Sequence, residues 1–127
     1  MRAYILVVDD NEINLKLLSK ILELGGYEVV TAHNGRDAIA KIQKRLPDLA
    51  ILDVMMPDMD GYELCKTLRQ PPFDTKIPIV MLTAMNDETE RNLAMKAGAN
   101  DIWSKPFEMD EMRTRLEHLL DRRQGER

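Results

Sequence analysis

The sequence predicts an α/β fold in which helices cover both faces of a parallel β-sheet. Two observations predict this fold. Five short apolar runs alternate with five segments of roughly ten to fifteen residues that carry apolar side chains at helical spacing, and the connecting loops are short. The third apolar run, Leu49–Leu52, is uninterrupted, which is typical of a strand that is buried on both faces. The alternation itself calls for parallel strands with helical crossovers.

The first predicted helix is apolar over a wide part of its surface. Asp10 or Asn11 caps it, it runs to about Leu24, and Gly25-Gly26 supplies the left-handed stop. Its apolar residues form two stripes, which predicts that the helix is substantially buried. The stripes are Ile13, Leu17, Ile21 and Leu24 on one side, and Leu15, Leu18 and Leu22 on the other.

The remaining segments are predicted from the same periodicities and from turn residues. Asp87 with Glu90 three residues later matches a capping box for a helix that stops at Gly98. The predicted strands are Tyr4–Val8, Tyr27–Ala32, Leu49–Leu52, Ile77–Leu82 and Asp101–Ser104. The other predicted helices run from Asn34-Gly35 to about Arg45, from Gly61 to Gln70, and from Met109 to about Leu120. The inward-facing residues of the second helix are Ala38, Ile39, Ile42 and Leu46.

Length, charge and cysteine content limit the functions of this chain. Its 127 residues fit one domain at 1–121, followed by a polar tail or the start of a linker at 122–127. The net charge is −4 and the basic residues are scattered, which argues against direct nucleic-acid binding. No apolar run approaches the roughly 18 residues of a membrane span, so we expect a cytoplasmic protein that makes no membrane contact. Cys65 is the only cysteine, which excludes an internal disulfide and a cysteine-rich zinc site.

Polar side chains follow four of the predicted strands. Asp9 and Asp10 come after the first strand and Asp53 after the third, whereas Thr83 and Lys105 come after the fourth and fifth. Ligands of open parallel sheets bind beyond the carboxyl ends of the strands, so we expect these side chains to converge. Each residue alone has an ordinary explanation as a helix cap, a turn former, a strand residue or a solvated lysine. Their coincidence at one edge of the sheet favours a binding site.

The chemistry of these groups points to a metal ion and a phosphoryl group. Three carboxylates and one ammonium leave two negative charges, and oxygen ligands without histidine or thiolate favour Mg²⁺ or Mn²⁺ over zinc. The usual partner of such a Mg²⁺ is a phosphoryl oxygen. In this hypothesis Asp53 is the nucleophile, Asp9 and Asp10 hold the metal, Lys105 is the fixed cation and Thr83 donates its hydroxyl.

Four segments that contain these residues resemble the receiver domain of two-component response regulators. They are VVDDN at 7–11, DVMMPDMDG at 53–61, PIVMLTA at 78–84 and KPF at 105–107. The resemblance is collinear over residues 3–120, and it extends to chemotaxis receivers and to the N-terminal receivers of larger regulators. It implies a flavodoxin-like, doubly wound, five-stranded parallel sheet of order 2-1-3-4-5 with five helices on two faces.

The resemblance also implies a mechanism. Asp53 would accept a phosphoryl group from the phosphohistidine of a sensor histidine kinase or a histidine phosphotransfer protein. Mg²⁺ would be surrounded by Asp9, Asp10, Asp53 and the Met55 carbonyl. Thr83 and Lys105 would bind the phosphoryl group, and Thr83 would act as the switch. The chain would modify only its own aspartate, so we do not expect an enzyme, and a cis peptide bond is implied before Pro106.

One departure from the family pattern concerns the expected output surface, which is formed by the last two helices and the strand between them. Downstream output domains or proteins, or a second copy in a homodimer, would bind there. Receivers commonly carry Tyr or Phe three residues before the lysine as a rotamer switch, but this chain has Ile102. We expect phosphorylation of Asp53 to be intact. The usual readout of phosphorylation, a rotamer change of that aromatic side chain, would be absent. Trp103 beside it is interpreted as a core residue, with a partner surface as the alternative.

Two other functions are alternatives to a phospho-accepting receiver. A pseudo-receiver would act as an interaction module without phosphorylation, but such modules usually lack an acid or the lysine. A Mg²⁺-dependent phosphatase of the haloacid-dehalogenase type also uses an aspartyl nucleophile, but that family has a second aspartate where Met55 stands. Met55, Met56, Met59 and Met85 are expected to pack against the loops around the site. His33 and His118 are expected to be surface residues.

Overall fold

The computed structural model describes residues 2–105 and 108–125, and for residues 122–125 it describes the backbone alone. In this part of the chain five strands alternate with five helices. The strands are β1 (Tyr4–Val8), β2 (Glu28–Ala32), β3 (Leu49–Asp53), β4 (Ile79–Thr83) and β5 (Asp101–Ser104). The helices are α1 (Glu12–Leu24), α2 (Gly35–Lys44), α3 (Gly61–Arg69), α4 (Glu88–Ala97) and α5 (Met109–Gly125).

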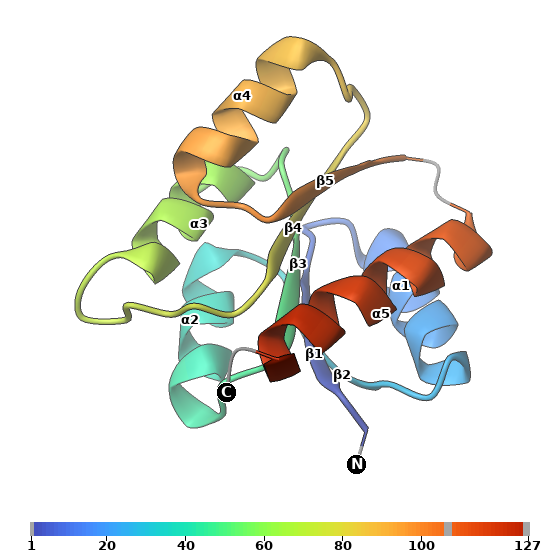
Figure 1. The fold of residues 1–127 in the computed structure, drawn as a ribbon. Coiled ribbons are helices and arrows are strands. Elements are labelled where there is room, and N and C mark those ends of the chain that lie inside the picture. The colour runs from blue at the N-terminus through green and yellow to red at the C-terminus, as the bar shows by residue number, and fades with distance from the viewer. Residues whose placement is uncertain (1, 106–107, 126–127) are drawn as a thin grey trace.

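All strand pairs in the sheet are parallel, and the strand order is β2-β1-β3-β4-β5. Helices α1 and α5 lie on one face of the sheet, and α2, α3 and α4 lie on the other (Figure 1). The strand order reverses between β1 and β3, so the carboxyl ends of these two central strands border the crevice where such sheets bind ligands. The predicted fold class and strand order are confirmed.

Side chains of the central strands alternate between two apolar cores. Leu6 and Val8 of β1 point toward α2, α3 and α4, whereas Ile5 and Val7 point toward α1 and α5. Every residue of β3 is buried, as its uninterrupted apolar run predicted. The sheet is therefore a rigid platform that is covered on both sides, and its strand ends are the places where polar groups can face solvent.

The helix starts confirm the predicted caps at Asn11 and Asp87, and Asn34 and Asp60 cap two further helices. The side chains of Asn11, Asn34, Asp60 and Asp87 each accept a hydrogen bond from a backbone N–H three residues later. Gly98, at the end of α4, has a φ of 96°, in the left-handed region where glycine is favoured. The capping pattern therefore located these ends correctly.

The prediction that both stripes of α1 are buried is wrong. Ile13, Leu17 and Leu24 are 77%, 56% and 75% exposed, whereas Leu15, Leu18 and Leu22 form part of the core. The physical reason is that α1 contacts the sheet along one side only, so a second apolar stripe turns toward solvent. Leu46, predicted to face inward after α2, is also exposed.

Two boundaries differ from those predicted by more than one residue. β4 begins at Ile79, two residues later than expected, because Pro78 has no N–H to donate to the sheet, although its carbonyl still accepts a hydrogen bond from Ala50. α5 extends to Gly125, so most of the predicted polar tail is helical. No helix in the described part of the chain has both the length and the apolar character required to cross a membrane.

Side chains from α2 and from Arg45, the residue that ends it, protect the outer edge of the sheet at β2. The Lys41 amine donates to the carbonyl of Thr31 at 2.9 Å. The Arg45 guanidinium pairs with Glu28 at 2.8 Å and lies over the ring of Tyr4, 3.7 Å from its centroid. The strand that lacks a neighbour on one side is therefore covered by charged groups.

Arg69 joins three segments at the opposite end of the sheet from the strand ends that carry the aspartates. Its guanidinium donates to the carbonyls of Gly98, Thr75 and Ile77 at 3.0, 3.1 and 2.7 Å, and to the side-chain oxygen of Asn100 at 2.8 Å. Burial lowers the pKa of this guanidinium. Arg69 thus fixes the end of α3, the loop before β4 and the loop after α4 relative to one another.

Candidate functional site

The carboxylates of Asp9, Asp10 and Asp53 meet at the carboxyl ends of β1 and β3. One oxygen from each of them lies within 4.8 Å of the other two. Asp9 and Asp53 are only 3% and 5% exposed, whereas Asp10 faces solvent. This cluster, which we call the acidic site, is placed by the sheet itself, because β1 and β3 are hydrogen-bonded neighbours with Val8 opposite Leu52.

Lys105 brings the positive charge to the acidic site from the far side of β4. Its amine lies 3.0 Å from an Asp53 oxygen and 3.7 Å from an Asp9 oxygen. Its backbone N–H donates to the carbonyl of Thr83 at 2.8 Å, which continues the pairing of β4 with β5 by one residue. The lysine is therefore anchored by the sheet, and only its side chain spans the site.

The negative charge of Asp53 is destabilised by its burial. Burial raises its pKa from 3.8 to about 6, and the neighbouring Asp9 also raises it, while the hydrogen bond and charge of Lys105 oppose the shift. One carboxylate oxygen of Asp9 accepts the backbone N–H of Asn11 at 2.9 Å, which gives Asp9 a partner that Asp53 lacks. A single lysine therefore does not compensate the two buried carboxylates, and the site favours binding of a further cation.

The Thr83 side chain is buried at the end of β4, but its hydroxyl is occupied by the next loop. The hydroxyl accepts the N–H of Met85 at 3.1 Å and lies 3.3 Å from the Met85 carbonyl. Thr83 is the residue of β4 that pairs with Ser104, immediately before Lys105. In this structure, the position of the hydroxyl is therefore set by the loop between β4 and α4.

A tight turn connects Asp53 to α3. Asp58 has a left-handed backbone with a φ of 69°, and the Gly61 N–H donates to the carbonyl of Val54 at 3.1 Å. A Cβ on Gly61 would lie 2.5 Å from the Asp53 carbonyl oxygen and 3.1 Å from the Val54 Cα. Because both contacts are backbone atoms of the site, only glycine allows α3 to begin this close to Asp53.

We expect Gly61→Ala to destabilise the domain by about 1–3 kcal/mol, because the added methyl group must displace the backbone that carries Asp53. Urea unfolding measures this loss. Gly25→Ala is the less crowded comparison, since a Cβ there meets its nearest neighbour at 3.3 Å and not at 2.5 Å. Equal effects of the two substitutions would show that the approach of Gly61 to Asp53 is not tight.

The residues of the acidic site fit a hard divalent cation. Its donors are carboxylate oxygens from three aspartates, and the described residues place no histidine or cysteine among them. Asp9, Asp10 and Asp53 could hold Mg²⁺ or Mn²⁺. The part predicted for the Met55 carbonyl stays a prediction. The cis bond predicted before Pro106 lies outside the described residues.

The loops around the site expose the thioethers that were expected to pack there. Met55 and Met85 are 76% and 64% exposed, so the prediction that they pack the loops is wrong for both. Met56 is buried, and Met59 lies partly buried against the core. In the turn after Asp53, Met55, Pro57 and Asp58 are exposed, whereas Met56 faces inward.

Ile102 and Trp103 lie on opposite faces of β5. Ile102 packs in the core cluster that contains Ala94 and Ala97 of α4. Trp103 is 3% exposed, packs with Met112 of α5, and donates its indole N–H to Asp101 at 2.7 Å. Its burial favours the interpretation as a core residue over a partner surface.

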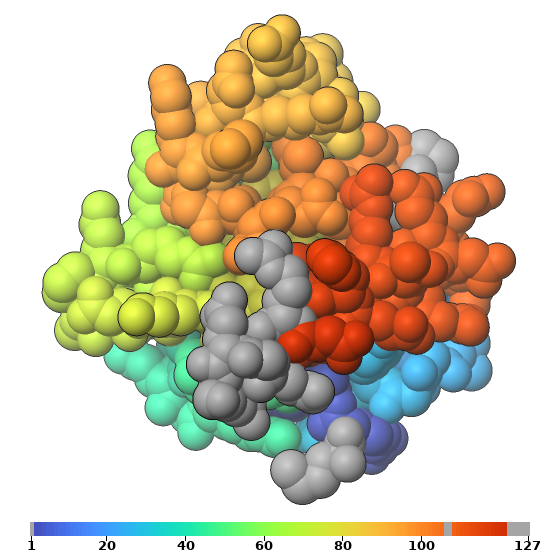
Figure 2. Space-filling model, viewed as in Figure 1, coloured from blue at the N-terminus to red at the C-terminus, as the bar shows by residue number. Residues whose placement is uncertain are grey.

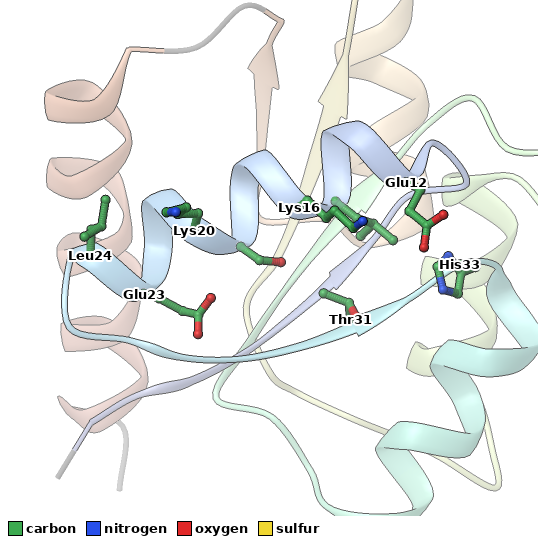
Figure 3. Close-up of a pocket in the computed structure, with 9 residues that line it drawn as sticks. Glu12, Lys16, Lys20, Glu23, Leu24, Thr31 and His33 are labelled. Carbon is green, nitrogen blue, oxygen red and sulfur yellow. The ribbon is translucent and has the colours of Figure 1, made fainter.

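Two of the cavities beside α1 lie near the carboxyl ends of the strands or along β2. One, of about 640 Å³, lies between α1 and β2, where the labelled side chains are spread along the helix and the strand (Figure 3). Its charged residues, Glu12, Lys16, Lys20 and Glu23, carry both signs of charge, and its lining includes no residue of the acidic site. The other, of about 330 Å³, is bordered by Asp9 and Lys105 together with apolar residues, among them Leu17 of α1. The second cavity therefore adjoins the acidic site.

Comparison with known proteins gives a consistent result. The family model described as the response regulator receiver domain matches residues 5–117. The chain is 44% identical over 122 residues to the alkaline phosphatase synthesis transcriptional regulatory protein PhoP of Bacillus subtilis, and these cover 96% of this chain and 50% of PhoP. It is also 44% identical to the phosphate regulon transcriptional regulatory protein PhoB of Rhizobium meliloti, over 99% of this chain and 56% of PhoB. The chain thus spans about half the length of these relatives.

Solved structures agree with the sequence comparison. The chemotaxis protein CheY4 of Vibrio cholerae superposes with a TM-score of 0.88 at 35% identity, and the match covers 94% of this chain and 99% of CheY4. A CheY-like response regulator receiver domain protein from Methanospirillum hungatei has a TM-score of 0.90 at 28% identity and is covered completely, as is this chain.

Proposed function

Because this chain belongs to the family of response regulator receiver domains of two-component systems, we propose that it accepts a phosphoryl group on Asp53 and thereby changes its affinity for a partner. The observation that carries the proposal is the convergence of three carboxylates with the Lys105 amine, which lies 3.0 Å from Asp53. The relatives are response regulators, and the proposed chemistry is confined to the protein's own aspartate.

The residues of the site match the needs of phosphoryl transfer. A carboxylate oxygen of Asp53 forms the new bond to phosphorus, the bond from phosphorus to the donor's imidazole nitrogen breaks, and the imidazole keeps the electron pair. Lys105 is positioned to stabilise charge on the phosphoryl oxygens. Mg²⁺ bound by Asp9, Asp10, Asp53 and the Met55 carbonyl would neutralise charge on the reacting oxygens. The buried, destabilised carboxylate of Asp53 favours neutralisation by a cation.

Thr83 is the proposed switch residue. Its hydroxyl is bonded to the Met85 backbone, and a phosphoryl group on Asp53 adds a strong acceptor beside it. Exchange of the Met85 partner for a phosphoryl oxygen would pull the loop between β4 and α4. The signal would then pass to α4, which begins five residues after Thr83.

The proposed phosphodonor is a protein, a sensor histidine kinase or a histidine phosphotransfer protein. The exposed side chains of Ile13 and Leu17 support this, because they form an apolar surface on α1 near the acidic site, and Leu17 also borders the adjoining cavity. A small phosphodonor would not need such a surface.

The proposed output surface consists of α4, β5 and α5, which lie together on the face shown in Figure 2. Arg115 of α5 joins Glu111 at 3.1 Å and reaches Asp101 of β5 at 3.6 Å. Met95 of α4 is exposed beside these charges. An output domain, a separate target protein or a second copy of the chain would bind there.

Incubation with acetyl phosphate and Mg²⁺, followed by intact-protein mass spectrometry, tests the proposal. We expect a base-labile mass increase of one phosphoryl group that is absent without Mg²⁺ and absent in Asp53→Asn. Asp121→Asn, which changes an exposed aspartate on α5, is the matched control and should leave the adduct unchanged. Absence of the adduct in the unsubstituted protein, or its persistence in Asp53→Asn, would reject the mechanism; complete absence would favour the pseudo-receiver.

A further inference from the structure

A hydrogen bond links the first turns of α3 and α4, which lie side by side (Figure 1). The Tyr62 hydroxyl of α3 donates to the Glu90 carboxylate of α4 and lies 3.4 Å from the Glu90 carbonyl. Both residues are half-buried, and the Tyr62 ring packs against the core. Burial and the Glu90 carboxylate raise the pKa of the phenol, which therefore remains a neutral donor at physiological pH.

Glu90 occupies a position from which it would normally cap its own helix. The Asp87 carboxylate accepts the Glu90 N–H at 2.9 Å, which is one half of a capping box. In the other half, the Glu90 carboxylate would accept the N–H of Asp87, but it accepts the Tyr62 hydroxyl instead. The Glu90 carboxylate thus binds Tyr62 of α3 in place of the backbone of its own helix.

Tyr62 and Glu90 each lie shortly beyond a strand that ends at the site. Tyr62 follows the turn after Asp53, and Glu90 follows the loop after Thr83. Tyr62 comes directly after Gly61, whose N–H is bonded to Val54 beside Asp53. Glu90 lies in the first turn of α4, which the short loop from Thr83 positions. The Tyr62–Glu90 hydrogen bond therefore connects the first turn of α3, which is held in place beside Asp53, to the first turn of α4, which would move with Thr83.

Movement of Thr83 would act on this bond. If its hydroxyl donates to a phosphoryl oxygen on Asp53, it gives up its contact with the Met85 carbonyl, and the loop and the first turn of α4 would shift with it. Gly61 prevents an equal shift of α3, because its backbone is in close contact with Asp53. A hydrogen bond weakens steeply when its geometry departs from the preferred range, so the displaced α4 would lose it.

We propose that the Tyr62–Glu90 hydrogen bond is a latch that holds α4 in its resting position and opposes switching by phosphorylation. This inference rests on the proposed function, because the hydrogen bond would regulate the response to phosphorylation of Asp53. It also gives a readout that does not need an aromatic residue at Ile102, because the change is registered between α3 and α4. Tyr62 and Glu90 are positioning residues in this device.

The test measures binding of beryllofluoride, a mimic of the phosphoryl group, by isothermal titration calorimetry in the presence of Mg²⁺. Tyr62→Phe removes the hydroxyl and keeps the ring in the core. Because the latch stabilises only the resting state, we expect this substitution to tighten binding about tenfold. Glu90→Gln, which keeps a neutral acceptor, should tighten it less. Tyr27→Phe, at a partly buried tyrosine next to β2, is the matched control and should leave the affinity unchanged.

Thermal unfolding of the same variants separates a latch from a merely structural contact. A structural bond that persists in both states would lower the melting temperature of Tyr62→Phe and leave the affinity for beryllofluoride unchanged, which would overturn the proposal. Weaker binding would place the bond in the switched state and overturn it as well. If the unsubstituted protein binds beryllofluoride but Tyr62→Phe binds no tighter, only the latch fails; if the unsubstituted protein binds none, the proposed function fails and the latch with it.

Discussion

Replacing Asp53 with asparagine is expected to stabilise the folded domain at neutral pH by about 1–3 kcal/mol in the absence of divalent cations. The cause is that burial raises the pKa of Asp53 to about 6, so keeping the carboxylate ionised at pH 7 costs folding free energy that an amide avoids. Asparagine has nearly the same shape and leaves Lys105 paired with Asp9. The residue proposed to carry the function is thus expected to reduce stability.

The raised pKa of Asp53 also predicts how the stability of the domain changes with pH. The pKa of Asp53 is higher in the folded state, about 6, than its ordinary value of 3.8, so the folded state binds more protons between these values. Stability should therefore fall as pH rises from about 4 to 6 in the unsubstituted protein, relative to Asp53→Asn. Urea unfolding at several pH values with a chelator measures the difference, and Asp121→Asn is the exposed control. A difference that is absent at pH 7, or largest at pH 4, would contradict the burial argument.

Replacing Arg69 with methionine is expected to destabilise the domain by about 2–4 kcal/mol. Methionine retains much of the aliphatic packing, but it leaves the carbonyls of Gly98, Thr75 and Ile77 without their guanidinium donor. Solvent can reach part of this region, which keeps the loss below the sum of three buried hydrogen bonds.

The control substitutions separate hydrogen bonding from charge. Arg69→Lys keeps the positive charge but cannot reach all four acceptors with one amine, so its loss should be at least half that of Arg69→Met. Arg36→Met, at an exposed position of α2, should change the free energy of unfolding by less than about 0.5 kcal/mol. Full stability of Arg69→Lys would mean that charge, and not the guanidinium geometry, holds this region.

The sequence was sufficient to predict the sheet and the residues that meet at its edge. Parallel strands end on one side, so Asp9 and Asp53 had to approach each other once β1 and β3 were recognised as strands. The lysine after the last strand followed by the same rule. Glycines and capping residues marked most of the helix ends, because their backbone requirements are local.

The features that the sequence did not predict depend on contacts between distant elements. The apolar pattern of α1 has two stripes, and nothing local decides that Leu15 is buried while Ile13 faces solvent. The partner of Glu90 was also beyond prediction, because a capping box and a bond to Tyr62 begin from the same residue pattern. Only the packing of α3 against α4 selects between them.

The charged cover on β2 also affects how copies of this protein can associate. An edge strand has unpaired backbone groups that can bind a strand of another molecule and start aggregation. A strand that approached β2 would have to displace the Lys41 amine from Thr31 and break the Arg45–Glu28 pair. Sheet extension across molecules is therefore disfavoured at this side. Lys41 of α2 and the cap residue Arg45 therefore protect this edge of the sheet.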